Sequence, residues 1–228
     1  MNTVAIPNSP YIALADDRSL TPWALDQGTI AIEKLIAACE PVASLKEGDL
    51  VIDCGAFIGD TAVIFQEQGA HVIAFEPQED AFACLVHNVH TSPPCICFNQ
   101  AVGDGVIVTP LQNARLGNLG TRTVARSVSG KPAIPLDWLA SRYRIDCSML
   151  KLIKIDVEGF EPAVLDGARG LIGLHKPSLL IEVYPEMLHY QNYTVASVYN
   201  RLLELGYDWD AIIGRESDPR WDVWAHPK

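Results

Sequence analysis

Short apolar segments alternate with segments of helical periodicity along most of the chain. Five of the apolar segments have the length and composition of strands, and they occupy residues 50–54, 71–75, 95–98, 152–157 and 178–183. The first, fourth and fifth are almost continuous in Val, Ile and Leu, which is typical of parallel strands buried on both faces. This alternation predicts β-α-β units around a largely parallel sheet.

Between these segments, the spacing of apolar residues predicts helices over residues 29–43, 59–68, 78–90, 162–171 and 195–205. Two further short apolar runs lie at 209–213 and 221–225. Pro162 falls in a predicted first turn, and Gly69 and Gly206 follow predicted last turns. These are the places where proline and glycine favour the start and the end of a helix.

Two segments depart from this pattern. Residues 1–28 contain three prolines and predict an arm or a cap, so we expect 1–44 to be an arm and a helix packed on one domain formed by 45–228. Residues 103–135 contain five glycines among β-branched residues and show no helical period. This segment predicts an irregular insertion or hairpin between the third and fourth strands.

The composition supports a single folded domain. Of the 228 residues, 49% are hydrophobic and 20% charged, which suits one large core and excludes extensive disorder. No stretch approaches about 18 consecutive apolar residues, and no basic residue precedes Arg18, so we expect neither a transmembrane helix nor a secretory signal. We therefore expect a soluble cytoplasmic protein with six reduced cysteines.

The charge is distributed unevenly along the chain. The net charge of −11 disfavours duplex nucleic acid or an anionic membrane as a partner of the whole surface. The segment 115–154 nevertheless has eight basic and two acidic residues, a net charge of +6. This segment overlaps the predicted insertion, so it predicts either an anionic ligand there or simply a set of solvated basic side chains.

The sequence V-I-D-C-G-A-F-I-G-D-T at 51–61 indicates a strand, a glycine turn and the start of a helix. Open α/β sheets bind nucleotide-like ligands at such turns. A dinucleotide-binding G-x-G-x-x-G that starts at Gly55 requires glycines where Phe57 and Asp60 stand. An aspartate at a helix start also competes with a diphosphate for the positive end of the helix dipole. Cofactors that bind through phosphate are therefore disfavoured, and with them a nucleotide-dependent oxidoreductase.

A cationic nucleoside without phosphate, S-adenosylmethionine (SAM), suits these residues better. Glu76 ends the second strand, 23 residues after Asp53. An acidic residue about 20 residues after the first strand commonly binds ribose hydroxyls. The structural alternative is that Asp53 and Glu76 only cap the helices that follow them.

A second polar group follows the fourth and fifth strands. Strand alternation places Lys154 and Asp156 on one face, and buried strands rarely contain such residues unless they are paired or functional. Asp53, Asp156 and Glu182 would lie at the carboxyl ends of three neighbouring strands, with Glu158 in the next turn. For Lys154 we favour a structural ion pair; for Asp156 and Glu158 we favour a function.

Metal binding by histidine is disfavoured, because the six histidines show no H-x-x-x-H spacing. We therefore predict no dedicated metal site. A Mg²⁺ bound by the carboxylates of Asp156 and Glu182 stays open as an alternative.

Taken together, V-I-D-C-G-A-F-I-G-D-T, A-F-E-P, L-I-K-I-D-V-E-G-F-E and P-S-L-L-I-E-V resemble the FkbM-type methyltransferase family, over about residues 45–213. The resemblance implies the class I methyltransferase fold, a Rossmann-like three-layer α/β sandwich with a mostly parallel seven-stranded sheet. It also implies SAM as the methyl donor and O-methylation of a small molecule or glycan, with a hydroxyl of a sugar or secondary metabolite as the acceptor. The rival interpretation is a non-catalytic module that binds the cofactor.

The resemblance also implies roles for individual residues. Asp53, Gly55 and Gly59 would shape the methionine side of the cofactor site, Glu76 would hold the ribose, and 99–101 would border the adenine. The cofactor-binding residues implied are Asp53, Gly55, Ala56, Phe57, Gly59, Asp60, Thr61, Glu76, Pro77, Asn99, Ala101 and Asp156. The resemblance places Asp156 and Glu158 facing the methyl group and the acceptor; with Glu182 at the end of the next strand, these are the candidate catalytic residues, Glu158 as the favoured base and Glu182 next.

Overall fold

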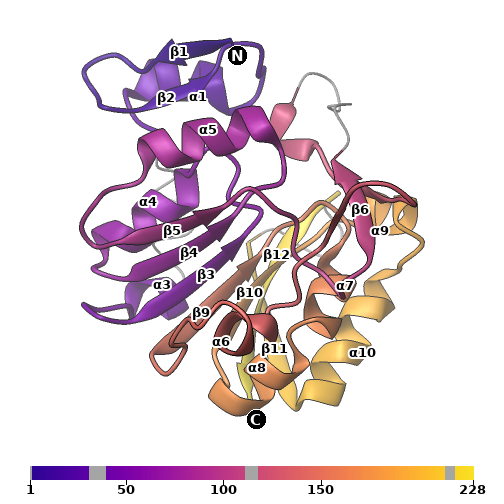
Figure 1. The fold of residues 1–228 in the computed structure, drawn as a ribbon. Coiled ribbons are helices and arrows are strands. Elements are labelled where there is room, and N and C mark those ends of the chain that lie inside the picture. Colours follow the sequence, from indigo (N-terminus) through magenta and orange to yellow (C-terminus); the bar gives the residue numbers. More distant parts are fainter. Residues whose placement is uncertain (1, 31–39, 111–117, 214–218) are drawn as a thin grey trace.

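The computed structural model describes residues 2–30, 40–110, 118–213 and 219–228 (Figure 1). Its central sheet has seven strands, in the spatial order β11 (Tyr207–Ile213), β12 (Trp221–Pro227), β10 (Ser178–Val183), β9 (Leu150–Ile155), β3 (Leu50–Cys54), β4 (His71–Phe75) and β5 (Cys95–Phe98). The pairs from β10 to β5 are parallel, and β12 is antiparallel to both of its neighbours. The predicted α/β fold with a mostly parallel seven-stranded sheet is confirmed.

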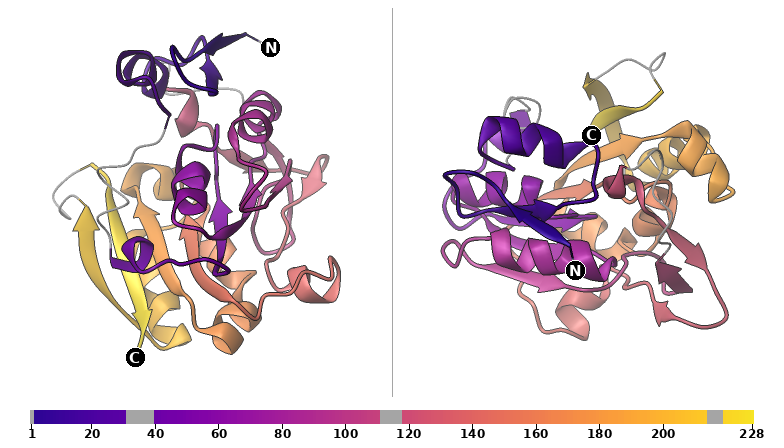
Figure 2. Two further views of the ribbon diagram at one scale, coloured as in Figure 1. Left: turned by 90° about the vertical axis from the view of Figure 1, so that its left-hand side faces the viewer. Right: turned by 90° about the horizontal axis from the view of Figure 1, so that it is seen from above.

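Helices cover both faces of the sheet, which gives three layers (Figure 2). Alternate side chains of β3 explain this: Ile52 and Cys54 enter a core on one face, whereas Val51 enters a core on the other. The first face is covered by α6 (Trp138–Ser141), α7 (Glu161–Asp166), α8 (Arg169–His175), α9 (Pro185–Tyr190) and α10 (Val195–Leu205). The second is covered by α3 (Glu40–Ala43), α4 (Asp60–Glu67) and α5 (Glu79–Asn88).

The single helix predicted over 162–171 is wrong, because the chain breaks there into α7 and α8. The carbonyl of Gly167 accepts the backbone N–H of Asp137 at 3.0 Å. The Asp137 carboxylate then accepts the N–H groups of Gly170 and Leu171 at 3.0 and 2.7 Å and so caps α8. A Cβ at Gly167 would lie 1.9 Å from the carbonyl oxygen of Gly103, so this crossing requires glycine.

The N-terminal segment, which the sequence predicts as an arm or a cap, contains two short strands and a helix. β1 (Thr3–Ala5) and β2 (Ile12–Leu14) form an antiparallel pair, followed by α1 (Leu20–Gln27). Their apolar side chains pack against α4 and α5, and the Asn88 side chain binds both backbone groups of Ile12 at 2.8 Å. Of the helix predicted over 29–43, the structure describes α3, and residues 31–39 lie outside the described residues.

The segment between β5 and β9 contains a small sheet of its own. β6 (Ile107–Pro110) lies between β7 (Val124–Arg126) and β8 (Lys131–Pro132), and a short 3₁₀ helix, η1 (Leu119–Thr121), precedes β7. The amide of Gln191 donates to Thr123 Oγ1 at 3.1 Å and to the carbonyl of Val124 at 2.6 Å, which ties this insertion to the end of α9. The segment is therefore more regular than predicted.

Two further sequence-based expectations concern thiols and membranes. Among the described residues, Cys54, Cys84, Cys95, Cys97 and Cys147 are free thiols. None of the described helices combines the length and the apolar character needed to cross a bilayer.

Candidate active site

A cavity of about 340 Å³ lies at the carboxyl ends of β3, β4, β9 and β10. Residues that immediately follow these strands form its base, including Gly55, Glu76 and Asp156. The N-terminal helix contributes Leu20, and the insertion contributes several residues from Asn118 to Val124. Segments distant in sequence therefore enclose one site at the edge of the sheet.

The turn after β3 brings two strand ends into direct contact. Gly55 has φ +84°, and a Cβ at this position would lie 1.8 Å from the carbonyl oxygen of Asp156. The N–H of Asp156 donates to the carbonyl of Cys54 at 3.0 Å. Only glycine permits this approach, so Gly55 fixes the glycine turn beside the first residue after β9.

Glu76 follows β4 and is 5% exposed. Its Oε2 accepts the N–H of Phe57 at 2.9 Å, and its Oε1 accepts the N–H of Gln78 at 2.7 Å. Burial raises the pKa of Glu76 to about 8, although the two N–H groups oppose this shift. The side chain thus joins the glycine turn to the start of α5, and it also lines the cavity.

Lys154 pairs with two carboxylates beneath the cavity. Its Nζ lies 3.1 Å from Asp156 Oδ2 and 3.6 Å from Asp53 Oδ1. Burial lowers the pKa of Lys154, but Asp156 and Asp53 more than offset burial and raise it above its usual value. The structure therefore shows the ion pair favoured for Lys154.

Asp53 is fully buried and lies behind the cavity wall, whereas Lys154 and Thr61 line the cavity. The hydroxyl of Thr61 donates to Asp53 Oδ2 at 2.6 Å. Burial raises the pKa of Asp53, opposed by Lys154 and Thr61. Asp53 therefore acts on the cavity through the two side chains that it holds.

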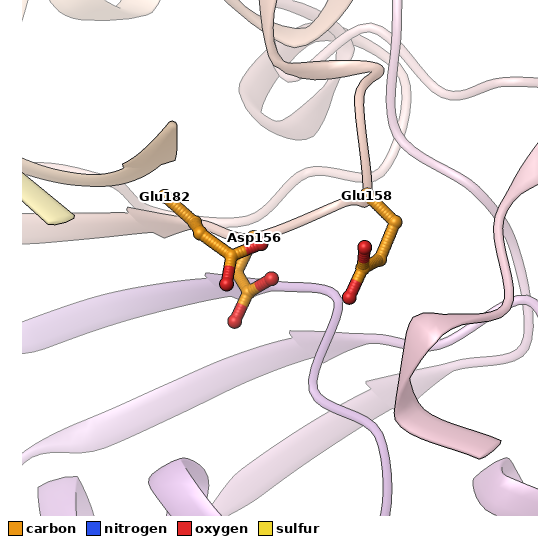
Figure 3. A group of neighbouring side chains, drawn as sticks. All are labelled: Asp156, Glu158 and Glu182. Carbon is orange, nitrogen blue, oxygen red and sulfur yellow. The ribbon is translucent and has the colours of Figure 1, made fainter. Parts of the chain in front are cut away.

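Three carboxylates meet at the other end of the cavity (Figure 3). Oxygens of Asp156, Glu158 and Glu182 all lie within 4.8 Å of one another. Glu158 has φ +54°, an uncommon conformation for a non-glycine residue, and this turn directs its side chain toward the other two. The structure thus brings together the three residues implied as catalytic.

This acidic group is poorly neutralised. Glu158 and Glu182 are 5% and 8% exposed, and each has one buried oxygen without a hydrogen-bond partner among the described residues. Burial, reinforced by Asp156, raises the pKa of both carboxyls well above their usual range. Arg220 Nη1 contacts Glu182 Oε1 at 3.2 Å. Burial also raises the pKa of Asp222, the β12 residue paired with Glu182, to about 6.

The other implied cofactor-binding residues divide into two sets. Phe57, Asp60, Pro77 and Ala101 line the cavity with those already described. Ala56, Gly59 and Asn99 do not line it. Asn99 instead donates its amide to the carbonyl of Glu76 at 2.9 Å, and Gly59 begins α4 with φ +92°.

Sequence reasoning missed several residues of the cavity wall. They include Arg122, Arg220 and Asp222. Arg122 is 7% exposed and binds both oxygens of Asp80 at 2.8 and 2.9 Å, which anchors the insertion to α5. The basic charge of segment 115–154 could have pointed to Arg122. No local sequence pattern indicates Arg220 or Asp222, which β12 brings to the site.

The Methyltransferase FkbM domain model matches residues 53–209. A solved structure of an FkbM methyltransferase from Methylobacillus flagellatus is similar, with a TM-score of 0.57 and 19% identity. That similarity covers 80% of this chain and 44% of the other, so this chain spans less than half of that protein. No curated protein sequence matches the chain.

Two smaller solved proteins share the fold over most of their length. A methyltransferase from Streptococcus mutans, solved in complex with S-adenosylhomocysteine (SAH), has a TM-score of 0.51 and 12% identity over 82% of this chain and 93% of the other. An rRNA methylase from Streptococcus thermophilus has a TM-score of 0.50 and 11% identity over 82% and 91%. The family model covers more than half of the chain, with the glycine turn, Glu76 and the acidic group inside the match, and the chain therefore belongs to the FkbM family of SAM-dependent methyltransferases.

Proposed function

We propose that this protein transfers the methyl group of SAM to a hydroxyl of a sugar, glycan or secondary metabolite. The observation that carries the proposal is one continuous cavity with a glycine turn at one end and three clustered carboxylates at the other. The close approach of Gly55 to Asp156 makes these two ends adjacent. Such a site can hold a donor and an acceptor in contact.

The residues present suit SAM as the donor. SAM supplies a methyl group on a positively charged sulfur, and the surplus of carboxylates in the cavity favours a cation. The Glu76 oxygens each have a further lone pair beyond the backbone N–H that they accept, so Glu76 can also bind ribose hydroxyls. Asp60 stands in the first turn of α4, where a diphosphate would otherwise bind.

The acidic group supports an acceptor that must lose a proton. A protonated hydroxyl is a poor nucleophile, and a carboxylate within reach accepts the proton as the new carbon–oxygen bond forms. Glu158 is the favoured base, because its buried Oε2 has no hydrogen-bond partner among the described residues and its carboxylate lies beside those of Asp156 and Glu182. Asp156 is held by Lys154 and places the donor.

Positioning contributes the larger share of the rate. Holding a donor and an acceptor in line corresponds to effective molarities of about 10⁵ M or more. A positioned base adds roughly 10²- to 10⁴-fold. Leu20, Arg122 and other residues from the N-terminal helix and the insertion line the cavity and can shield the reacting groups from water.

We further propose an anionic acceptor and a cytoplasmic location. The Arg220 side chain is 52% exposed beside the acidic group and can meet a negative charge on the acceptor. Nucleotide-linked and acidic sugars are acceptors of this kind.

The experiment that tests the proposal measures SAH formation from SAM against nucleotide sugars, free glycans and polyketide alcohols. Thermal unfolding with SAH or with NAD, recorded first, separates this function from an oxidoreductase, because only SAH should stabilise the protein. Binding of SAH without turnover of any hydroxyl compound would favour a non-catalytic module. Methylation of amines alone would overturn the hydroxyl acceptor.

A further inference from the structure

The acidic group has the geometry of a cation site as well as that of a base. We propose that Asp156, Glu158 and Glu182 together bind one hard divalent cation of the Mg²⁺ or Mn²⁺ type. Carboxylate oxygens are the ligands these ions prefer. The binding site is argued from geometry alone, whereas its role in catalysis rests on the function proposed above.

The distances are within reach of a single ion. On an octahedral Mg²⁺, neighbouring oxygens lie about 3.0 Å apart and opposite ones about 4.2 Å apart. One oxygen from each of the three side chains lies within 4.8 Å of the other two. Side-chain rotations that close these distances by about 1–2 Å would place all three on one ion.

A second observation is the orphaned oxygen of Glu158. This side chain is 95% buried, its Oε2 has no hydrogen-bond partner among the described residues, and it points into the group. Buried polar atoms are nearly always satisfied, so an atom of this kind indicates a missing partner. Glu182 Oε2 is a second buried oxygen in the same condition.

Among the described residues, the cations near this group do not fill this need. Lys154 is shared between Asp156 and Asp53, and Arg220 contacts Oε1 of Glu182. Asp222 adds a further carboxylate to the same cavity. Of the described residues, four carboxylates at this end face one shared lysine and one half-exposed arginine, so a divalent cation would restore the balance of charge.

Such a cation would also restrict the kinds of acceptor that can bind. Three protein oxygens leave about three positions of an octahedral ion open. Two neighbouring oxygens of the acceptor, such as a vicinal diol, can occupy two of them. Coordination lowers the pKa of a bound hydroxyl. The proton then leaves the hydroxyl for a carboxylate while the oxygen takes the methyl group and SAH departs as the neutral product.

The test uses the full chain, stripped of metal with a chelator, and Mn²⁺ alone as the probe, without SAM. We expect electron paramagnetic resonance to show one Mn²⁺ bound per chain and displaced by Mg²⁺. Glu182→Gln removes a ligand at nearly constant volume and should weaken Mn²⁺ binding about tenfold or more. Glu158→Gln should do the same and serves if the first variant does not fold, as judged by circular dichroism.

Two matched variants separate coordination from general attraction. Asp222→Asn removes a negative charge from the same cavity but no ligand, and should change Mn²⁺ affinity less than about threefold. Arg220→Met removes the cation that competes for Glu182 and should tighten Mn²⁺ binding, a direction that loss of structure would not produce.

Three results would overturn the proposal: no saturable binding of Mn²⁺ below about 1 mM, affinity unchanged by both glutamine variants, or an equal loss in Asp222→Asn. SAH calorimetry on the same samples tests the proposed function separately. Binding of SAH without binding of Mn²⁺ would remove the cation site alone, and the reverse would remove the methyltransferase function alone.

Discussion

The two ends of the cavity hold buried carboxylates in different ways. The donor end is formed by the glycine turn after β3 and by Glu76, and the acidic end is formed by Asp156, Glu158 and Glu182. At the donor end, both oxygens of Glu76 accept backbone N–H groups, and Asp53 accepts the Thr61 hydroxyl and lies 3.6 Å from Lys154 Nζ, although its Oδ1 has no hydrogen-bond partner among the described residues. At the acidic end, Glu158 and Glu182 each keep a buried oxygen without a partner among the described residues. Backbone N–H groups therefore satisfy Glu76, whereas the two glutamates of the acidic end crowd other carboxylates.

This difference follows from where the residues come from. The donor end uses turns that directly follow β3 and β4, and their own backbone supplies the hydrogen bonds. The acidic end collects side chains from β9, β10 and β12, and its charges crowd one another. Buried carboxyls whose pKa values burial and a neighbouring carboxylate raise are a common feature of catalytic centres.

The largest expected effect concerns the acidic end. Glu158→Gln keeps the size of the side chain and removes its basicity, so turnover should fall on the order of 10²-fold or more while SAH binding stays nearly unchanged. Steady-state kinetics with the acceptor found by the screen, together with SAH calorimetry, measure both. Asp156→Asn should impair both turnover and SAH binding.

Near-normal turnover of a folded Glu158→Gln protein would contradict this assignment. Glu158 would then be structural, and Glu182 would become the candidate base.

The next effect concerns the donor end. Glu76→Gln keeps one acceptor oxygen but replaces the other with an amide nitrogen, and should weaken SAM binding by about 0.5–1.5 kcal/mol, the net contribution of a typical hydrogen bond. Calorimetry with SAH measures the loss. Glu79→Gln, at an exposed position three residues along the chain, is the matched control and should bind normally. Equal affinity of the Glu76 variant and the control would leave Glu76 as a structural link only.

The pH dependence of stability should differ in sign between two carboxylates near the cavity, Glu161 and Asp80. Burial raises the pKa of Glu161, beneath the acidic end, to about 7 from 4.5. The folded state then holds a proton that the unfolded state has lost, so this residue's contribution to stability is lost as the pH rises from about 4.5 through 7. Glutamine does not titrate, so Glu161→Gln avoids this loss of stability. The melting temperature of the variant minus that of the wild type should therefore increase between pH 5 and pH 8.

Asp80, at the donor end, provides the opposite case. Burial acts to raise its pKa, but hydrogen bonds from Arg122 outweigh burial and lower it below 3.8. Its contribution is therefore present above that pH and lost below it. Asp80→Asn should be less stable than the wild type by a constant amount between pH 5 and 8. This difference in stability should shrink as the pH falls below about 4. A parallel response of the Asp80 and Glu161 variants would contradict the opposite pKa shifts of these two residues.

The smallest effect concerns salt. If the acceptor is anionic, its KM should rise with NaCl, because the half-exposed Arg220 is screened, while the KM for SAM changes less. Kinetics at low and high ionic strength measure this difference. A neutral acceptor with salt-independent KM would remove the hypothesis of an anionic acceptor.

The sequence predicts the donor end better than the acidic end. The strand, the glycine turn and Glu76 are local signals, so 51–61 and 76 suffice to place them. The contact between Asp156 and Gly55 depends on β9 lying beside β3, which alternation of elements predicts only in general terms. Arg220 and Asp222 carry no local signal, because β12 brings them to Glu182 by antiparallel pairing.

The errors in predicting the helices have physical causes too. Periodicity alone extends a helix through 162–171, because the pattern of apolar residues continues across the break. The break occurs where Asp137, distant in sequence, forms three hydrogen bonds. Its N–H donates to the carbonyl of Gly167, and its carboxylate accepts the N–H groups of Gly170 and Leu171. At the N-terminus, three prolines mask the short elements β1, β2 and α1, which are ordered by packing on α4 and α5.

The order of the strands has a kinetic consequence. β11 precedes β12 in the chain, yet it joins the sheet only through β12, which lies between β11 and β10. β11 cannot dock without β12, whereas β12 also pairs directly with β10, so every opening of β12 releases β11 as well. Backbone amides of β11 should therefore exchange at least as fast as those of β12. Because β12 carries Asp222 and follows Arg220, each opening of β12 would also withdraw these two residues from the acidic end and leave the donor end intact.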